Sequence, residues 1–179
     1  MTDLFSVEDL LNHAGVEPGM VVLEVHPSRS GMMTHALGSR VGSRGQVYAV
    51  DPRHEVVSWL EGVRRSWSMP QVRVLKGDPE VKQGLNLEDE SVDRIILLNS
   101  LWLVRNVSTY IEELRRSLRP RGEIVVVEWR PQVVSPYAPP LEYRVAEEDA
   151  CAAFDAGQCY ACGRVPISDS HWGWRFIKD

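Results

Sequence analysis

The sequence predicts an α/β protein built on a mostly parallel β-sheet, and three observations support this class. Short segments rich in β-branched residues alternate with longer amphipathic segments along most of the 179 residues. The short segments are almost continuously apolar, which is typical of strands buried on both faces of a parallel sheet. The amphipathic segments carry apolar side chains at helical spacing and end near glycine or proline. Alternating strands and helices form βαβ units, whose right-handed crossovers place helices on both faces.

Seven segments are expected to be strands. Five of them are four to seven residues long and belong to the parallel part of the sheet: 21–25, 46–50, 72–75, 94–98 and 123–129. Two further segments lie near residues 158–167 and 171–177. Only three residues separate these two, and so short a turn makes them antiparallel neighbours.

Five helices are expected between and after these strands. Ser6 and Asp9 have the spacing of a capping box, and they open the first helix. Glycine or proline stops the helices, with Pro120 ending the fourth. The expected helices cover residues 6–15, 33–41, 56–63, 110–118 and 146–156. No repeat or linker interrupts the chain, so we expect one domain over residues 1–179, with a proline-rich loop at residues 131–140.

The composition excludes several classes of protein. With 20 basic and 25 acidic side chains the formal charge is −5, so the chain lacks the cationic excess that binds nucleic-acid phosphates. No apolar segment approaches the roughly 20 residues that span a bilayer. The N-terminus lacks the basic and apolar regions of a secretory signal, and three cysteines cannot form a full disulfide framework. We therefore expect a reduced, cytoplasmic protein.

A metal site is the alternative interpretation of the cysteines. Cys159 and Cys162 are spaced as a zinc or redox pair, and Cys151 with His171 would complete four ligands. However, this spacing fits no established zinc pattern, and the pair lies in an expected strand. We therefore expect buried or half-buried thiols in a strand and no metal.

The expected ligand site follows from the architecture. In an open parallel sheet, ligands bind beyond the carboxyl ends of the strands, where the strand order reverses. Asp51 ends the second strand, and a carboxylate there can accept hydrogen bonds from both hydroxyls of a ribose. The alternative is that Asp51 lies at a helix N-terminus with Pro52 as the first helical residue. Asp78 ends the neighbouring strand and strengthens the ligand interpretation.

Five stretches of the sequence together resemble a known family in order and spacing. They are VEPGMVVLEV, VGSRGQVYAVDP, VRVLKGDPE, ESVDRIILLNSLWLV and YIEELRRSLRPRGEIVVVEW. From about residue 15 to the end, the chain is similar to class I S-adenosylmethionine-dependent methyltransferases of the type-11 or ubiquinone-biosynthesis-like kind. The resemblance implies S-adenosylmethionine as the cofactor. It also implies a Rossmann-like fold whose seven-stranded sheet has the order 3-2-1-4-5-7-6, with only the last strand antiparallel.

The resemblance also implies roles for individual residues. Glu24 resembles the acid that holds the amino-acid end of the cofactor. Asp51 resembles the acid that binds its ribose, and Asp78 the acid that meets its adenine amino group. The resemblance further places five residues beside the adenine ring or the methionine portion of the cofactor: Pro52, Pro79, Asn99, Ser100 and Leu101.

The glycine-rich loop of the family is missing from this chain. The segment after Glu24 contains His26, Ser28 and Arg29 where the family has Gly-x-Gly-x-Gly, and at most Gly31 is retained. Glycine permits positive φ and close approach of the backbone to a ligand, so this loop must follow another path. One interpretation is a reshaped pocket in which Arg29 pairs with the cofactor's carboxylate. The other is a site that has lost its affinity.

The function implied by the resemblance is methyl transfer from S-adenosylmethionine to an unidentified acceptor, expected to be a small molecule. No catalytic residue is assigned, and the acceptor-site candidates are Trp102, Glu128, Tyr137 and Tyr143. The acceptor site would come from the N-terminal helix, the 131–144 loop or a second subunit, which leaves a homo-oligomer open. The alternative is a catalytically inactive scaffold with the methyltransferase fold. A nicotinamide-dependent oxidoreductase is disfavoured, because the chain lacks Gly-x-Gly-x-x-Gly.

Overall fold

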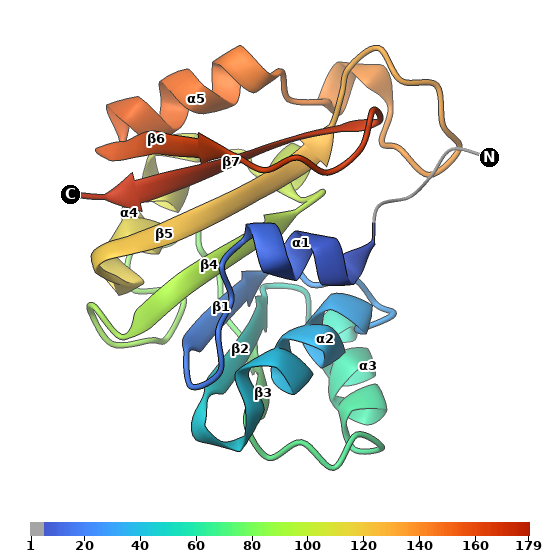
Figure 1. Cartoon of the computed structure of the whole chain (residues 1–179), viewed down its shortest axis with the longest axis vertical. Helices are drawn as coiled ribbons and strands as arrows, with labels where there is room; N and C mark the ends of the chain where they lie inside the picture. The colour runs from blue at the N-terminus through green and yellow to red at the C-terminus, as the bar shows by residue number, and fades with distance from the viewer. Residues whose placement is uncertain (1–5) are drawn as a thin grey trace.

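A computed structural model describes residues 6–179, and the strands form one sheet in the order β3-β2-β1-β4-β5-β7-β6 (Figure 1). Neighbouring strands pair in parallel except at β7, which is antiparallel to both β5 and β6. The strands are β1 (Val21–Val25), β2 (Gln46–Asp51), β3 (Val72–Lys76), β4 (Val92–Leu98), β5 (Leu118–Trp129), β6 (Cys159–Arg164) and β7 (His171–Lys178). The predicted sheet order and the antiparallel pair near the C-terminus are confirmed.

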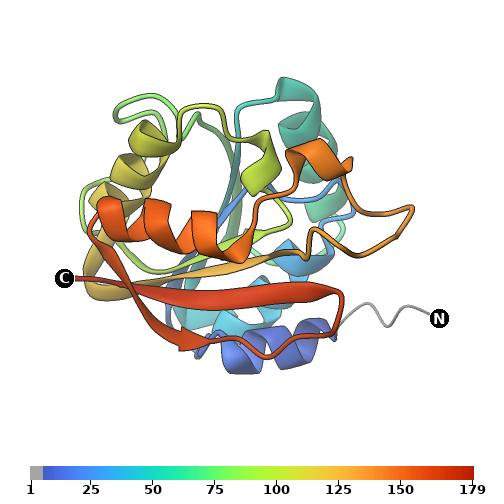
Figure 2. The same cartoon turned by 90° about the horizontal axis from the view of Figure 1, so that it is seen from above.

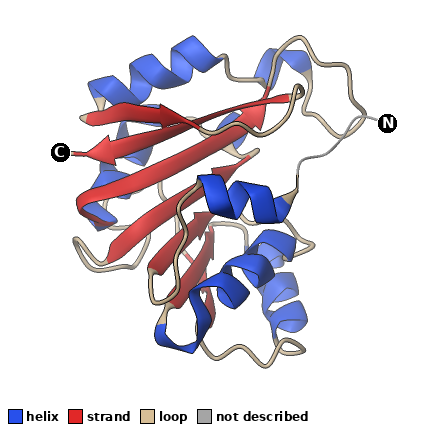
Figure 3. Ribbon diagram, viewed as in Figure 1, coloured by secondary structure: helices blue, strands red, loops and turns tan. Residues whose placement is uncertain are grey.

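Helices cover both faces of the sheet, as predicted (Figure 3). Apolar side chains of α1 and α2 pack on one face with Val22, and those of α4 and α5 pack on the other with Leu23. Seen from above, α1 and α5 lie on opposite sides of β7 (Figure 2). The helices are α1 (Val7–His13), α2 (Met32–Val41), α3 (His54–Arg64), α4 (Val107–Ser117) and α5 (Glu147–Ala156), with short 3-10 helices at Gly42–Arg44, Leu101–Leu103 and Leu141–Tyr143. Within the described residues, no helix combines the length and apolar character needed to cross a membrane.

The predicted helix ends are largely correct. The Ser6 hydroxyl accepts a hydrogen bond from the Asp9 N–H at 3.3 Å and caps α1. Gly42 ends α2 with a φ of 65°, a conformation that costs other residues strain. Gly157 follows α5 directly. The chain therefore stops these helices with the residues that the sequence pattern indicated.

The predicted start of β5 is wrong. We expected Pro120 to end α4 and the strand to begin at residue 123, but α4 ends at Ser117 and the strand begins at Leu118. Leu118 pairs with Val92, and the register then shifts before Arg94 pairs with Glu123. The residues around Pro120 therefore form an irregular segment within a long strand, because the extra residues bulge out of the ladder.

The helix expected over residues 56–63 is α3, which starts two residues earlier, and the alternative with Pro52 as its first residue is wrong. Pro52 is not the first helical residue, because α3 begins at His54 after Arg53 in an extended conformation. The Asp51 carboxylate accepts a hydrogen bond from the Arg53 N–H at 2.8 Å, and this contact holds the two residues in a turn before the helix. Asp51 is therefore not a residue of the helix.

A buried carboxylate holds the connection between β3 and β4, which carries Asp78. Glu113 of α4 is 2% exposed and accepts hydrogen bonds from the N–H groups of Gln83 and Leu85 at 3.0 and 3.1 Å. It also pairs with Arg116 one turn later at 2.7 Å. Burial alone would raise the pKa of Glu113, but the hydrogen bonds from Arg116, Leu85 and Gln83 outweigh it and lower the pKa.

We expect Glu113→Ala to lower the free energy of unfolding by about 3 kcal/mol, because it leaves Arg116, the buried N–H of Leu85 and the partly buried N–H of Gln83 without this partner. Urea denaturation measures the change. Glu112→Ala is the matched control, since Glu112 is exposed and accepts a hydrogen bond from the Ser108 hydroxyl one turn away, so it should change the free energy by no more than about 0.5 kcal/mol. Equal effects of the two substitutions would contradict this role. Because the pKa of Glu113 is lowered, the cost of Glu113→Ala should shrink as the pH falls through that pKa.

Candidate functional site

A cavity of about 670 Å³ lies at the carboxyl ends of the parallel strands. These ends point to the right in Figure 1, towards the side on which the 131–140 loop lies. The chain runs from β1 to β2 in one direction and returns to β4 on the other side of β1, so the cavity lies where the strand order reverses. Its size is within the range of about 300–1,000 Å³ that is typical of small-molecule sites.

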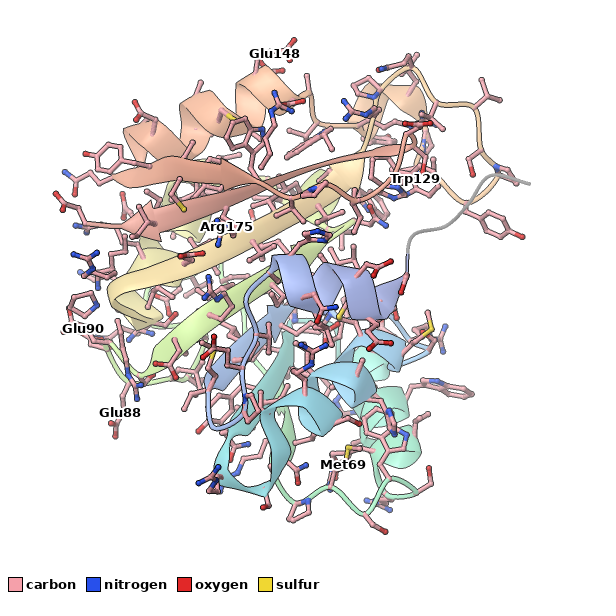
Figure 4. All side chains as sticks on the ribbon, in the orientation of Figure 1. Met69, Glu88, Glu90, Trp129, Glu148 and Arg175 are labelled. Atoms are coloured by element: carbon pink, nitrogen blue, oxygen red, sulfur yellow. The ribbon has the colours of Figure 1, made fainter. Side chains whose placement is uncertain are left out.

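The structure brings seven of the predicted site residues together on this cavity: Glu24, His26, Ser28, Arg29, Asn99, Trp102 and Tyr137. Nine predicted residues do not line it: Gly31, Asp51, Pro52, Asp78, Pro79, Ser100, Leu101, Glu128 and Tyr143. Sequence reasoning missed three polar or aromatic lining residues: Ser30, Arg53 and Trp129. Trp129 is the last residue of β5 (Figure 4), and its place at a carboxyl strand end is the signal that could have identified it.

The first residue of the loop after β1 has a left-handed backbone conformation, although it is not glycine. His26 has a φ of 55°, and its N–H donates to the Val50 carbonyl at 3.0 Å, which extends the pairing of β1 with β2. Gly31 ends the loop with a φ of 65°. A Cβ there would lie 2.6 Å from the Leu60 side chain and 2.8 Å from that of Trp67, so this position needs glycine for packing.

Glu24 projects from β1 towards the start of α2 and lines the cavity. It is 3% exposed, and its Oε2 accepts a hydrogen bond from the Thr34 hydroxyl at 2.6 Å. Burial raises the pKa of Glu24 to about 7, and the Thr34 hydroxyl offsets only part of this effect. Glu24 can therefore change its protonation state near neutral pH.

Asp51 lies behind the cavity wall and is held by Arg53. The Arg53 side chain donates from Nε to Oδ1 at 2.8 Å and from Nη2 to Oδ2 at 2.7 Å. His26 Nδ1 lies 3.6 Å from the same Oδ2. Burial alone would raise the pKa of Asp51, but the hydrogen bonds from Arg53 and the nearby imidazole of His26 hold it at about 2. Asp51 is thus an anion whose nearest partners both line the cavity.

Arg29 and the first turn of α2 supply positive potential at one end of the cavity. The exposed Arg29 guanidinium lies 5.3 Å from the centre of the Trp59 ring, within the range of a cation–π contact. The first turn of α2 carries no acidic residue, and its N-cap Gly31 has no side chain to accept from the helix N–H groups. A helix N-terminus of this kind favours an anion.

Backbone and carboxylate contacts shape the opposite wall, after β4. Asn99 has a φ of 51°, its N–H donates to the Val127 carbonyl at 2.8 Å, and its carbonyl accepts from Trp102 Nε1 at 3.0 Å. Glu128 Oε1 accepts from the N–H groups of Ser100 and Leu101, both at 2.6 Å. Burial raises the pKa of Glu128 to about 7, and these hydrogen bonds oppose the shift. Glu128 therefore braces the segment that carries Asn99 and Trp102.

The remaining predicted residues lie around this centre. Tyr137 stands on the proline-rich loop, whose carbonyls at Pro131, Val133 and Pro139 accept hydrogen bonds from the Arg144 guanidinium. Tyr143 lies in the following 3-10 helix and is exposed.

The residues after β3 and the cysteines also lie away from the cavity. The Asp78 carboxylate accepts from the Glu80 N–H at 2.9 Å in the connection after β3, where Pro79 is buried. Cys151, Cys159 and Cys162 are free thiols; in β6, Cys159 is buried as predicted, but Cys162 is exposed because its side chain points to the other face of this edge strand. Across residues 6–179, no cluster of three or more His, Cys, Asp or Glu side chains is placed to hold a metal ion.

Comparison with known sequences identifies a methyltransferase domain. The type-11 methyltransferase domain matches residues 28–126 of this chain. A demethylmenaquinone methyltransferase from Staphylococcus aureus (strain MRSA252) is 32% identical over 122 residues, which are 66% of this chain and 47% of the relative. The chain thus spans about half the length of this curated relative.

Solved structures share the fold over nearly the whole chain. A SAM-dependent methyltransferase from Aquifex aeolicus has a TM-score of 0.88 at 24% identity, with 98% of this chain and 91% of that chain covered. A type 11 methyltransferase structure from Sulfolobus solfataricus has a TM-score of 0.76 at 22% identity, with 99% and 95% covered. The [4+2]-cyclase SpnF also shares the fold, with a TM-score of 0.77 at 13% identity and 96% and 79% covered, so the fold alone does not fix the reaction. Because the methyltransferase domain matches more than half of the sequence, this chain belongs to the type-11 family of class I S-adenosylmethionine-dependent methyltransferases.

Proposed function

We propose that this protein transfers a methyl group from S-adenosylmethionine to a small-molecule acceptor in the cavity at the carboxyl ends of the strands. One observation carries the proposal. The cavity joins a polar end, with Glu24, Arg29 and the start of α2, to walls that include Trp102 and Tyr137. The polar end suits the amino-acid portion of the cofactor, and the aromatic walls suit an acceptor.

Polar groups without partners support the fit of a ligand to this cavity. Three buried side-chain atoms have no hydrogen-bond partner among the described residues. They are Nδ1 and Nε2 of His26 and Oδ1 of Asn99. Buried polar atoms normally find partners, so these two side chains, which follow the neighbouring strands β1 and β4, favour a polar ligand in the cavity. Both residues line the cavity.

The amino-acid end of the cofactor would lie between Glu24 and Arg29. Glu24, when ionised, can accept hydrogen bonds from an ammonium group, and Arg29 together with the first turn of α2 can hold a carboxylate. Arg29 would have to leave the face of Trp59, an exposed contact worth about 0.5–1 kcal/mol. Side chains would thus replace the backbone contacts that a glycine-rich loop supplies.

The nucleoside end would lie towards the carboxyl ends of β2 and β3. Asp51 for the ribose and Asp78 for the adenine, with Pro52 and Pro79 beside the ring, stay proposals that rest on the family resemblance. The single domain over residues 1–179 and the cytoplasmic location likewise stay predictions from the sequence.

The acceptor would lie against Trp102, Trp129 and Tyr137. When bound, the cofactor's sulfonium supplies an activated methyl group, so the protein has mainly to align the acceptor and exclude water. Glu128 accepts hydrogen bonds from two backbone N–H groups and does not line the cavity, so we place it as a support of this wall and not as a base. The curated relative is named for a small-molecule substrate, demethylmenaquinone, which supports the acceptor class proposed here.

The alternative function is a scaffold with the methyltransferase fold and no catalysis. Its support is the absence of glycine from residues 26–30 and the contact of Arg53 with Asp51. Calorimetry with S-adenosylhomocysteine separates the two functions. We expect measurable binding, and absence of both heat and thermal stabilisation at millimolar ligand would favour the scaffold.

We expect Arg29→Ala to weaken the binding of S-adenosylhomocysteine by about tenfold, because one charge-assisted hydrogen bond contributes about 1.5–3 kcal/mol and Arg29 is exposed. Isothermal titration calorimetry measures the change. Arg44→Ala is the matched control, since Arg44 is an exposed arginine next to the amino end of β2, and it should leave the affinity unchanged. If the Arg29 variant and the unaltered protein bind S-adenosylhomocysteine with the same affinity, Arg29 does not contribute to cofactor binding.

We expect the affinity for S-adenosylhomocysteine to fall about tenfold from pH 8 to pH 6. The ligand's ammonium needs an ionised Glu24, and the pKa of Glu24 in the ligand-free protein is about 7. Glu24→Gln should flatten this pH dependence. Glu128 has the same pKa of about 7 but does not face the cavity, so Glu128→Gln should preserve it. If Glu128→Gln flattens the pH dependence and Glu24→Gln does not, the titrating carboxylate is Glu128 and the role given to Glu24 is wrong.

A further inference from the structure

We propose that Arg53 competes with the cofactor's ribose for Asp51. In the ligand-free protein the Arg53 guanidinium occupies the carboxylate, and the ribose hydroxyls bind when this side chain swings away. Arg53 thereby determines the affinity and the ribose selectivity of the site. This inference rests on the proposed function, because it concerns the same cofactor.

The acceptor positions of Asp51 are nearly all occupied. A carboxylate offers about four lone-pair positions to hydrogen-bond donors. Oδ1 accepts from the Arg53 N–H and from Nε, both at 2.8 Å, and Oδ2 accepts from Nη2 at 2.7 Å. A ribose diol donates from two adjacent hydroxyls and so needs two acceptor positions. With Arg53 in place, Asp51 has about one left.

The Arg53 side chain is free to move, whereas Asp51 is not. The Asp51 side chain is 1% exposed, and that of Arg53 is 41% exposed and lines the cavity. In the described part of the chain, the Arg53 guanidinium donates hydrogen bonds to Asp51 alone. Its release therefore breaks one ion pair, and the ribose hydroxyls would replace the hydrogen bonds that the carboxylate loses.

His26 supplies an independent sign that a ligand belongs at this carboxylate. Its side chain is 4% exposed, lines the cavity and holds Nδ1 3.6 Å from Asp51 Oδ2, too far for a hydrogen bond. Neither ring nitrogen has a hydrogen-bond partner within residues 6–179. A hydroxyl that replaces Arg53 at Oδ2 would also lie within reach of the imidazole, so the same ligand would satisfy both side chains.

The test is the affinity of Arg53→Ala for S-adenosylhomocysteine, measured by calorimetry. We expect binding about tenfold tighter than in the unaltered protein, because the ligand no longer displaces a charged hydrogen-bond donor. Arg65→Ala is the charge-matched control, since Arg65 is exposed at the end of α3, and it should leave the affinity unchanged. Unchanged or weaker binding by the Arg53 variant would overturn the inference.

Two further measurements separate competition from a merely structural role. Arg53→Gln keeps a neutral donor beside the buried Asp51 and should also tighten binding, which covers the case in which Arg53→Ala folds poorly. In an Asp51→Asn background, the gain from removing Arg53 should disappear. Adenosine has the ribose diol and 2′,3′-dideoxyadenosine lacks it. The preference for adenosine over 2′,3′-dideoxyadenosine should rise in Arg53→Gln, because the diol no longer has to displace the Arg53 guanidinium from Asp51. A preference that stays constant would overturn the inference.

The inference and the proposed function fail in different ways. If the unaltered protein does not bind S-adenosylhomocysteine, the proposed function fails. In that case binding by Arg53→Gln would still support competition, and no binding by either protein would overturn it. If the unaltered protein binds and the Arg53 variants bind no better, the proposed function stands without the competition.

Discussion

Parallel pairing of β1 between β2 and β4 is the constraint on which the candidate site depends. Val25 pairs with Val50 on one side and with Leu97 on the other, so the three strands end at nearly the same level. The connections that follow then start from one edge of the sheet. Because they leave in opposite directions, a cavity remains between them, and His26, Arg53 and Asn99 reach it from three different strands.

The chemistry of the site depends on how three buried carboxylates are satisfied. Glu24 accepts a hydrogen bond from the Thr34 hydroxyl, and its pKa is about 7. Asp51 has a guanidinium, which keeps its pKa at about 2. Glu128 has two backbone N–H groups, which oppose the effect of burial without overcoming it. The three therefore differ in use: Asp51 is a permanent anion, Glu128 supports the backbone, and Glu24 faces the cavity and can respond to the charge of a ligand.

The sequence predicted the fold more completely than the site, for physical reasons. Runs such as 94–98 are apolar enough to specify buried strands, and the rule on strand ends then places the cavity. Which side chain faces the cavity depends on alternation along a strand, so Glu128 and Trp129 exchange roles with a shift of one residue. The contact of Arg53 with Asp51 depends on the side-chain torsions of Arg53, which the spacing of residues in the sequence does not reveal. The early start of β5 depends on a bulge, which hydrophobic periodicity does not detect.

Strain around the cavity favours a ligand-binding role over a scaffold role. His26 and Asn99 are two non-glycine residues with positive φ, at 55° and 51°, and they line the same cavity. Such conformations cost of order 1 kcal/mol each and persist only where the surroundings enforce them. Here hydrogen bonds from both N–H groups to the neighbouring strands enforce them. In a purely structural loop, glycine at this position would relieve the strain, or a buried ring there would have a hydrogen-bond partner. His26 instead has a strained backbone, and its imidazole has no hydrogen-bond partner among the described residues. This combination is expected of a side chain that binds a ligand.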